Sequence, residues 1–281
     1  MKIRNLIYAV LLSALCLATS CVQHAPEYVP GEAPTGTQVF FPSDVQIGTI
    51  TLDETKPVIV PVTRVNTSNA LTVNIISSAD PAFNVPSTVE FAAGAKDATI
   101  VINYDAKKLV RGDNYTISLT LGNETTPYGA STYDITLYVN PWGTIGTVSY
   151  TDGGWYEETY TVELQYSAPD DKYRLIDLWG TGVNWDFKIG VSLGDGFYSV
   201  LPGSGIKLSN GYYRTNTGLV HPSYGAVFTY DDHDPEYTYF SNMTNDGKFK
   251  VGSKMTIDRQ WRVSAGSFGW YTDTMVITSL E

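Results

Sequence analysis

Hydrophobic and polar residues alternate along most of this chain, and that spacing is typical of half-buried β-strands. In the segment 115–121, Tyr115, Ile117 and the following alternate residues fall on one face, whereas hydroxyl side chains fall on the other. The same pattern recurs at 98–104 and 133–139, with shorter versions at 47–52, 58–62 and 71–75. Residues 105–110 predict a single helical turn, which Gly112 ends. We therefore predict an all-β fold.

Two β-sandwich domains in tandem are the predicted architecture. Residues 37–140 hold about seven short strands separated by turns, as in an immunoglobulin-like sandwich. Asn140 and Pro141 interrupt the last strand and predict a domain boundary. Residues 141–281 alternate again at 160–166 and at 254–263, where Arg259 departs from the pattern, and glycine-containing turns at 152–154, 210–211 and 245–247 suit hairpins. This second domain is predicted to be an aromatic-rich sandwich or a jelly-roll-like domain.

Four segments of residues 37–140 carry a resemblance to a known family. They are Val39-Phe40-Phe41-Pro42-Ser43, residues 59–64, residues 83–94 and Tyr128-Gly129-Ala130-Ser131. Together they resemble the Calx-beta-like domain found near the N-terminus of many lipoproteins of gut anaerobes. The resemblance implies an immunoglobulin-like fold and a cell-envelope setting rather than an activity. Calcium-binding members gather carboxylates at one end of the sandwich, whereas the acidic residues of this segment are scattered, so calcium binding is not carried over.

Segments of the second domain are similar to the C-terminal half of the same group of lipoproteins. They are residues 147–152, residues 160–164 and residues 173–175. Such lipoproteins are associated with polysaccharide-utilisation systems, so the resemblance implies a setting in which glycans are captured.

The first 20 residues resemble a secretory signal peptide. Lys2 and Arg4 precede an apolar run at 6–17, and small residues at 18–20 precede Cys21. The run is too short to span a bilayer as a finished helix. A cysteine directly after small residues resembles the lipobox of bacterial lipoproteins, which implies that Cys21 is acylated and anchors the chain to a membrane. Ordinary signal cleavage, which would leave Cys21 as a free thiol, is the alternative.

Residues 21–36 have the composition of a lipidated tether, with several prolines and glycines and few large apolar side chains. Two or three acyl chains would hold the protein to a bilayer nearly irreversibly. We therefore expect an outer-membrane lipoprotein of the cell envelope. Surface-exported lipoproteins of gut anaerobes often carry acidic residues directly after the cysteine, whereas the first acid here is Glu27. The periplasmic and the outer face of the membrane both remain open.

Both predicted domains are acidic. The chain has 18 basic and 29 acidic side chains and a formal net charge of −11. Residues 22–140 contain 6 basic and 12 acidic side chains, and residues 141–281 contain 10 and 17. Neither part carries a basic stripe, so nucleic acid is not an expected partner.

Catalytic motifs are absent from the sequence, so we predict that the protein is not an enzyme. It has no Gly-x-Ser-x-Gly elbow, no dinucleotide or phosphate-binding glycine loop and no His-Glu-x-x-His. With Cys21 reserved for lipid, the histidines His24, His221 and His233 do not assemble a convincing zinc or Cys-His site.

The carboxylates nearest to a glycosidase pair are Glu157, Glu158 and Glu163. Because Glu158 and Glu163 are five residues apart, they would face opposite sides of one strand. We interpret all three as solvent-facing charges.

The densest polar cluster lies at 231–236. A calcium ion takes six to eight oxygen ligands, and Asp231, Asp232, Asp234 and Glu236 could supply several. The spacing and the glycine of an EF-hand are missing, so a solvated acidic loop is favoured over a calcium site. No cofactor is predicted.

Aromatic residues are concentrated in the second domain. Residues 22–140 contain 10 and residues 141–281 contain 25, including all six tryptophans. Sugars stack their apolar C–H faces on such rings, so aromatic side chains near turns are candidate glycan contacts. Packing in the core or across strands is the alternative for each of them. The candidates are Trp155, Tyr156, Trp179, Trp185, Tyr212 and Tyr213.

The predicted function is that of a membrane-anchored, non-catalytic lipoprotein that binds a polysaccharide or host glycan through residues 141–281. An adhesin, or an assembly partner in an outer-membrane complex, fits the same features nearly as well. A glycoside hydrolase is the third alternative.

Overall fold

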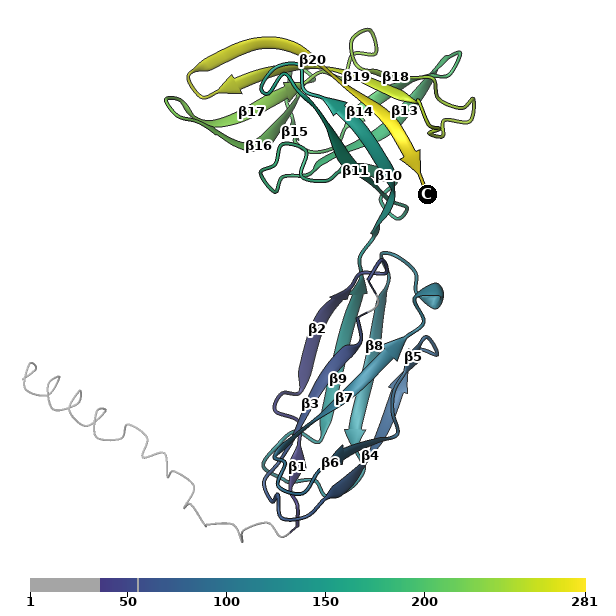
Figure 1. Ribbon diagram of the computed structural model, residues 1–281, viewed down its shortest axis with the longest axis vertical. Coiled ribbons are helices and arrows are strands. Elements are labelled where there is room, and N and C mark those ends of the chain that lie inside the picture. Colours follow the sequence, from purple (N-terminus) through teal and green to yellow (C-terminus); the bar gives the residue numbers. More distant parts are fainter. Residues whose placement is uncertain (1–35, 55) are drawn as a thin grey trace, which may run out of the picture.

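A computed structural model of the chain describes residues 36–54 and 56–281. The predicted signal peptide, Cys21 and His24 lie outside the described residues. The described chain is all-β, which confirms the predicted fold class, and its strands form three sheets (Figure 1). The predicted helical turn is a short 3₁₀ helix, η1 (Ala106–Lys108). Within the described residues, no helix is long and apolar enough to cross a membrane.

Two facing sheets form the N-terminal part of the molecule, as a β-sandwich requires. One has the order β1-β3-β7-β5 and the other the order β2-β9-β8-β4-β6. All of these strands pair antiparallel except β2 and β9, which are parallel. The strands are β1 (Val39–Phe40), β2 (Val45–Ile50), β3 (Val58–Arg64), β4 (Leu71–Ala79), β5 (Phe83–Asn84), β6 (Thr88–Phe91), β7 (Asp97–Tyr104), β8 (Asn114–Leu121) and β9 (Thr132–Val139).

The period-two pattern sets the core of this sandwich. Ile117, Leu119 and Leu121 of β8 are buried, whereas the hydroxyl residues between them are more exposed. They join one hydrophobic cluster that runs from Val39 to Val139. A second hydrophobic cluster runs from Val148 to Ile277 and shares no residue with the first.

A single 11-stranded sheet forms the C-terminal part. Its strands are β10 (Trp142–Thr151), β11 (Thr159–Ser167), β12 (Lys172–Leu175), β13 (Trp185–Gly194), β14 (Phe197–Pro202), β15 (Ile206–Lys207), β16 (Tyr213–His221), β17 (Gly225–Asp231), β18 (Tyr239–Ser241), β19 (Lys254–Val263) and β20 (Gly266–Leu280).

This sheet closes on itself, where a sandwich or jelly roll was predicted. Strand β19 pairs with both β18 and β20, and β20 also pairs with β10, so the sheet forms a ring of β10, β11, β12, β13, β14, β18, β19 and β20. Each strand of the ring pairs on both sides, whereas an open sandwich leaves edge strands; the remaining edge strand of this sheet is β15. The sequence pattern could not distinguish the two, because a barrel and a sandwich both bury one face of every strand.

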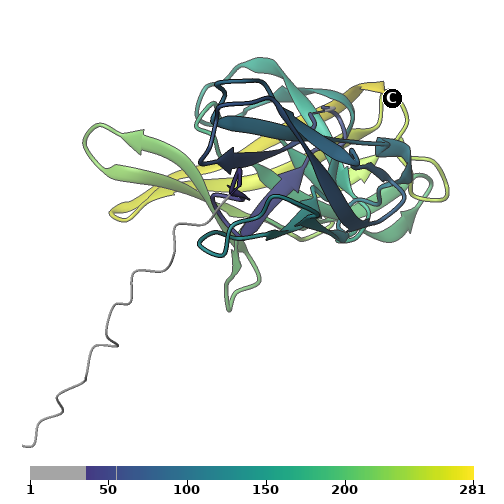
Figure 2. The same ribbon diagram turned by 90° about the horizontal axis from the view of Figure 1, so that it is seen from below.

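Two hairpins extend beyond this barrel. The far half of β19 pairs with β17 instead of β18, and β16 and β15 continue the sheet outward. The β16–β17 hairpin and the ends of β19 and β20 therefore project together from one side of the barrel (Figures 1 and 2). This projecting part, β16–β17–β19–β20, has one face that continues the core and one outer face.

Arg111 connects the two parts where β9 passes into β10. Its guanidinium lies 2.7 Å from Asp53 and donates to the carbonyl of Trp142. The aromatic ring of Trp142 in turn lies 3.7 Å beneath the guanidinium of Arg174.

Candidate functional site

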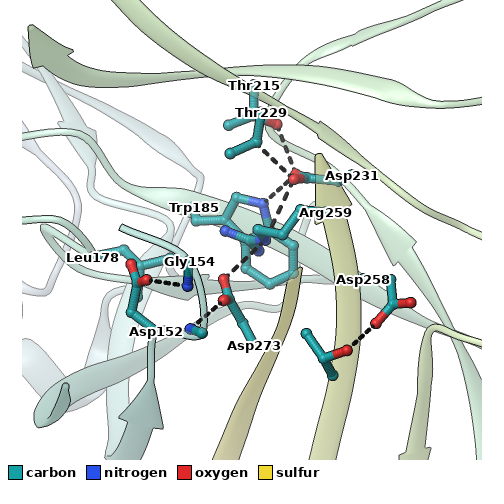
Figure 3. A network of polar contacts seen from close by, with 12 residues as sticks. Asp152, Gly154, Leu178, Trp185, Thr215, Thr229, Asp231, Asp258, Arg259 and Asp273 are labelled. Carbon is teal, nitrogen blue, oxygen red and sulfur yellow. Dashed lines mark hydrogen bonds and ion pairs between the residues drawn. The ribbon is translucent and has the colours of Figure 1, made fainter. Parts of the chain in front are cut away.

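A buried ion pair network lies on the inner face of β17, β19 and β20 (Figure 3). Arg259 is the residue that departs from the apolar alternation of β19, and it is fully buried. Its Nε lies 3.4 Å from Asp231 on β17 and 3.2 Å from Asp273 on β20. Both carboxylates are also fully buried, so the guanidinium lies between two negative charges inside the protein.

Further hydrogen bonds fix both carboxylates. Asp231 accepts from the indole N–H of Trp185 at 2.9 Å and from the hydroxyl of Thr229 at 2.7 Å. Asp273 accepts from the hydroxyl of Tyr150 at 2.5 Å and from the backbone N–H of Gly153 at 2.8 Å. The network therefore links β10 and β20, the first and the last strands of the C-terminal part.

Burial shifts the acid–base properties of this network. It raises the pKa of Asp273 from its ordinary value of 3.8 to about 6, although the neighbouring Arg259 opposes the shift. Burial also raises the pKa of Tyr150 well above its usual range.

The same strands present a second set of side chains on the outer face. On β17 and β19, Asp231 is paired with Arg259. In the next row Tyr230 of β17 is paired with Gln260 of β19, and Gln260 is also paired with Trp270 of β20. Because strand side chains alternate between faces, burial of the charged row exposes this adjacent row. The buried network thus fixes which side chains of β17, β19 and β20 face solvent.

An open cavity of about 200 Å³ lies on the outer face. The rings of Tyr212 and Trp270 approach to 5.2 Å, and Trp270 and Tyr237 are 43% and 45% exposed. Two carboxylates complete the lining. The lining residues are Tyr212, Asp232, Tyr237, Asp258 and Trp270, which we call the aromatic pocket.

The polar groups of the aromatic pocket are held by short bonds. Asp258 accepts from the hydroxyl of Thr272 at 2.6 Å. Asp232 accepts from the backbone N–H groups of His233 and Asp234 at 2.7 and 2.9 Å. Oriented carboxylates beside exposed aromatic rings are suited to accept hydrogen bonds from a ligand's hydroxyl groups while its apolar face stacks on a ring.

Tyr212 is one predicted glycan contact that does lie in this pocket. It follows Gly211, which has a φ of 94° and whose turn closes the β15–β16 hairpin. A Cβ at that position would come within 2.6 Å of the His233 ring. Glycine therefore allows the turn that places Tyr212 beside the acidic segment.

Trp179 and Trp185 are not surface contacts, which corrects the prediction made for them. They are 1% and 0% exposed. Their rings lie 5.4 and 4.8 Å from the guanidinium carbon of Arg259. A buried cation favours aromatic faces around it, and this is the role that the two side chains fill.

The remaining predicted aromatic residues lie apart from the aromatic pocket. Trp155 is half-buried and stacks on the buried Trp261 at 5.7 Å. Tyr156 is 43% exposed, and its hydroxyl donates to the carbonyl of Trp179. Tyr213, on the opposite face from Tyr212, packs 6.3 Å from the ring of His233.

The acidic cluster at 231–236 divides into different environments. Asp231 is buried in the ion pair network and Asp232 lies in the aromatic pocket, whereas Asp234 and Glu236 are exposed. Asp234 accepts from the backbone N–H of Glu236 at 3.0 Å. Within the described residues, no group of three or more His, Cys, Asp or Glu side chains gathers at one point.

The candidate glycosidase residues lie in different environments. Glu163 is half-buried and accepts from Thr144 and Gln165. Glu157 and Glu158 are exposed beside the turn that follows Asp152. Glu157 and Glu158 are solvent-facing charges, whereas the burial and hydrogen bonds of Glu163 correct the interpretation made for it.

Sequence reasoning missed Tyr237, Asp258 and Trp270. The sequence pattern of β20 did indicate an exposed Trp270. The alternate residues Tyr271 and Asp273 face inward, so Trp270 falls on the other face of the strand, with Thr272 and Thr274. A tryptophan among the polar positions of a strand indicates an exposed ring. Asp258 could not be assigned to the aromatic pocket from the sequence, because its position beside β20 follows only from the strand order.

No family model and no curated protein matches this sequence. Solved structures align over most of its length at low identity. A protein of unknown function from Bacteroides ovatus is 10% identical, covers 86% of this chain and 90% of its own, and has a TM-score of 0.32. An auxiliary nutrient binding protein from Bacteroides thetaiotaomicron is 8% identical over 84% and 89%, with a TM-score of 0.30. Protocadherin gamma C5 EC1-3 is 12% identical over 86% and 67%, with a TM-score of 0.29. At these scores the similarities carry no inference about the function of this chain.

Proposed function

We propose that this protein is a non-catalytic glycan-binding protein and that the aromatic pocket is its binding site. The observation that carries the proposal is the combination of exposed rings, Trp270 and Tyr237, with two oriented carboxylates in one open cavity. A sugar ring offers an apolar face to the aromatic rings and hydroxyl donors to the carboxylates. Both requirements of a saccharide are therefore met by neighbouring side chains.

The test is a glycan array probed with the soluble chain from Val22 to Glu281 and with its Trp270→Ala variant. The proposal predicts binding to a restricted set of glycans that the substitution abolishes. Trp155→Phe, which changes an aromatic residue outside the pocket, serves as the control and should bind as the unmodified chain does. Array binding that survives Trp270→Ala, or release of sugar products from a bound polysaccharide, would contradict the proposal.

Membrane attachment through Cys21 is part of the same proposal. It rests on the signal-like segment and the small residues before the cysteine, and on the resemblance of residues 37–140 to lipoprotein domains. In this arrangement the tether and the N-terminal sandwich act as a spacer that holds the pocket away from an outer membrane.

A protein-binding role is the second candidate, and one observation favours it. Strand β2 lies at the edge of its sheet, with Val45 54% and Ile47 81% exposed. Exposed apolar side chains on an edge strand suit contact with another protein. Co-purification of an envelope protein that Ile47→Asp prevents, without any glycan binding, would favour this role over the first.

A further inference from the structure

The outer face carries a second group of side chains on β16, β17 and β19, beside the aromatic pocket. Arg214 on β16 lies over the ring of Phe228 at 4.2 Å, and Arg262 on β19 lies over the ring of Tyr230 at 4.8 Å. The two rings are themselves 5.6 Å apart. These four residues, which we call the arginine patch, therefore form one stack across three strands.

The charges of the arginine patch are not neutralised by the protein. The described residues provide no carboxylate within ion pair distance of Arg214 or Arg262, although acidic side chains outnumber basic ones 29 to 18 in the chain. Arg262 donates to the side chain of Gln260 at 2.6 Å, and its Nε is buried without a partner in the protein. Arg214 is exposed. A ligand that brings an anion would supply the partner that is lacking.

A cavity adjoins this patch. It has a volume of about 520 Å³, and Arg214 and Phe228 line it together with the polar side chains of Asn184, Ser204 and Asn216. The cavity provides room for a sugar-sized group beside the guanidinium. The amide and hydroxyl side chains provide hydrogen-bonding partners for it.

We infer that the arginine patch is a second binding subsite, for the carboxylate of an acidic sugar residue. A guanidinium stacked on an aromatic ring keeps the N–H groups at its edge free, and their fork matches the two oxygens of a carboxylate. The carboxylates of the aromatic pocket repel an acidic residue, so a glycan with a uronate at one end binds in a single direction along this face. The choice of a saccharide as carrier of the anion rests on the proposed function.

The test is calorimetric titration of the chain from Val22 to Glu281 with a neutral oligosaccharide that ends in a single uronate and with its methyl ester, in which that carboxylate is neutralised. The acidic form is expected to bind about ten-fold or more tightly than the ester, and Arg214→Gln is expected to remove that difference. High salt should weaken the acidic form alone. Lys254→Gln removes a positive charge from the opposite end of β19 and should leave both affinities unchanged.

Equal affinity for the acid and its ester, or an unchanged preference in Arg214→Gln, would overturn the subsite. Binding of a sulfated oligosaccharide without binding of the uronate-ended oligosaccharide would also overturn it. The two proposals fail separately. Glycan binding that depends on Trp270 without any preference for acid contradicts only the arginine patch, whereas acid binding that depends on Arg214 but not on Trp270 contradicts only the aromatic pocket.

Discussion

The ring of Tyr212 lies 5.2 Å from the ring of Trp270, although Tyr212 precedes β16, and β17 and β19 lie between β16 and the β20 strand of Trp270. The contact therefore requires the projecting strands to be in register. The residues that fix the register are buried beneath it, where Arg259 joins Asp231 to Asp273. The geometry of the aromatic pocket thus depends on the buried ion pair network. Substitutions at buried Arg259 and Asp273 test the network, and substitutions at exposed Trp270 test the pocket.

Replacement of Arg259 by methionine should destabilise the protein strongly. The substitution leaves the carboxylates of Asp231 and Asp273 buried without their cation, which costs about 3 to 5 kcal/mol in the free energy of unfolding. Urea denaturation measures the change. Lys254→Met, an exposed substitution on the same strand, should alter stability by no more than about 0.5 kcal/mol. Equal stability of the two variants would show that the network contributes nothing.

The stability contributed by Asp273 should decrease as pH rises. Its pKa is about 6 in the folded protein against an ordinary 3.8, so the folded state binds the proton more tightly. The contribution is fully present below pH 3.8 and is lost as pH rises through about 6. The shift corresponds to about 3 kcal/mol, since each pKa unit is about 1.4 kcal/mol.

Asp273→Asn provides the comparison, because asparagine does not titrate. The difference in unfolding free energy between the unmodified chain and this variant should move in favour of the variant between pH 4 and pH 7. Denaturant titrations at several pH values measure it. A constant difference, or one that moves the other way, would contradict the raised pKa.

Cys21→Ala should release the protein from membranes. Without the thiol no acyl chains can be attached at this position, and hydrophobic anchoring is lost. Fractionation of cells expressing the full chain should move the protein from the sedimented membranes to the soluble fraction. A variant that still sediments with membranes would show that Cys21 is not the anchor.

The alternation of hydrophobic and polar residues was sufficient to predict the fold class and eight of the twenty described strands. It predicted β8 and its buried face correctly, because each strand buries one side whatever its partner. It could not predict that β19 pairs with both β18 and β20, because pairing partners are set by the whole chain. The closure of the barrel could therefore not be predicted from the local alternation of residues.

The partners of Arg259 could not be predicted from the local sequence pattern either. In the sequence it interrupts the apolar alternation of β19, whereas in the structure it keeps the alternation and is neutralised by distant carboxylates. Those carboxylates come from β17 and β20. Trp179 and Trp185 were expected near the surface because they adjoin turns, but they surround this buried cation. Tyr212 could be identified from its turn and Trp270 from its polar neighbours on β20, but the contact between their rings required the tertiary structure.

Titration of a glycan identified on the array against Trp270→Ala and Trp270→Phe tests the central claim most directly. Phenylalanine keeps an aromatic face for stacking, whereas alanine removes it. Calorimetry should show a loss of affinity of about ten-fold or more for alanine and a smaller loss for phenylalanine. Unchanged affinity in Trp270→Ala, with the variant folded as judged by its melting temperature, would contradict a glycan site in the aromatic pocket.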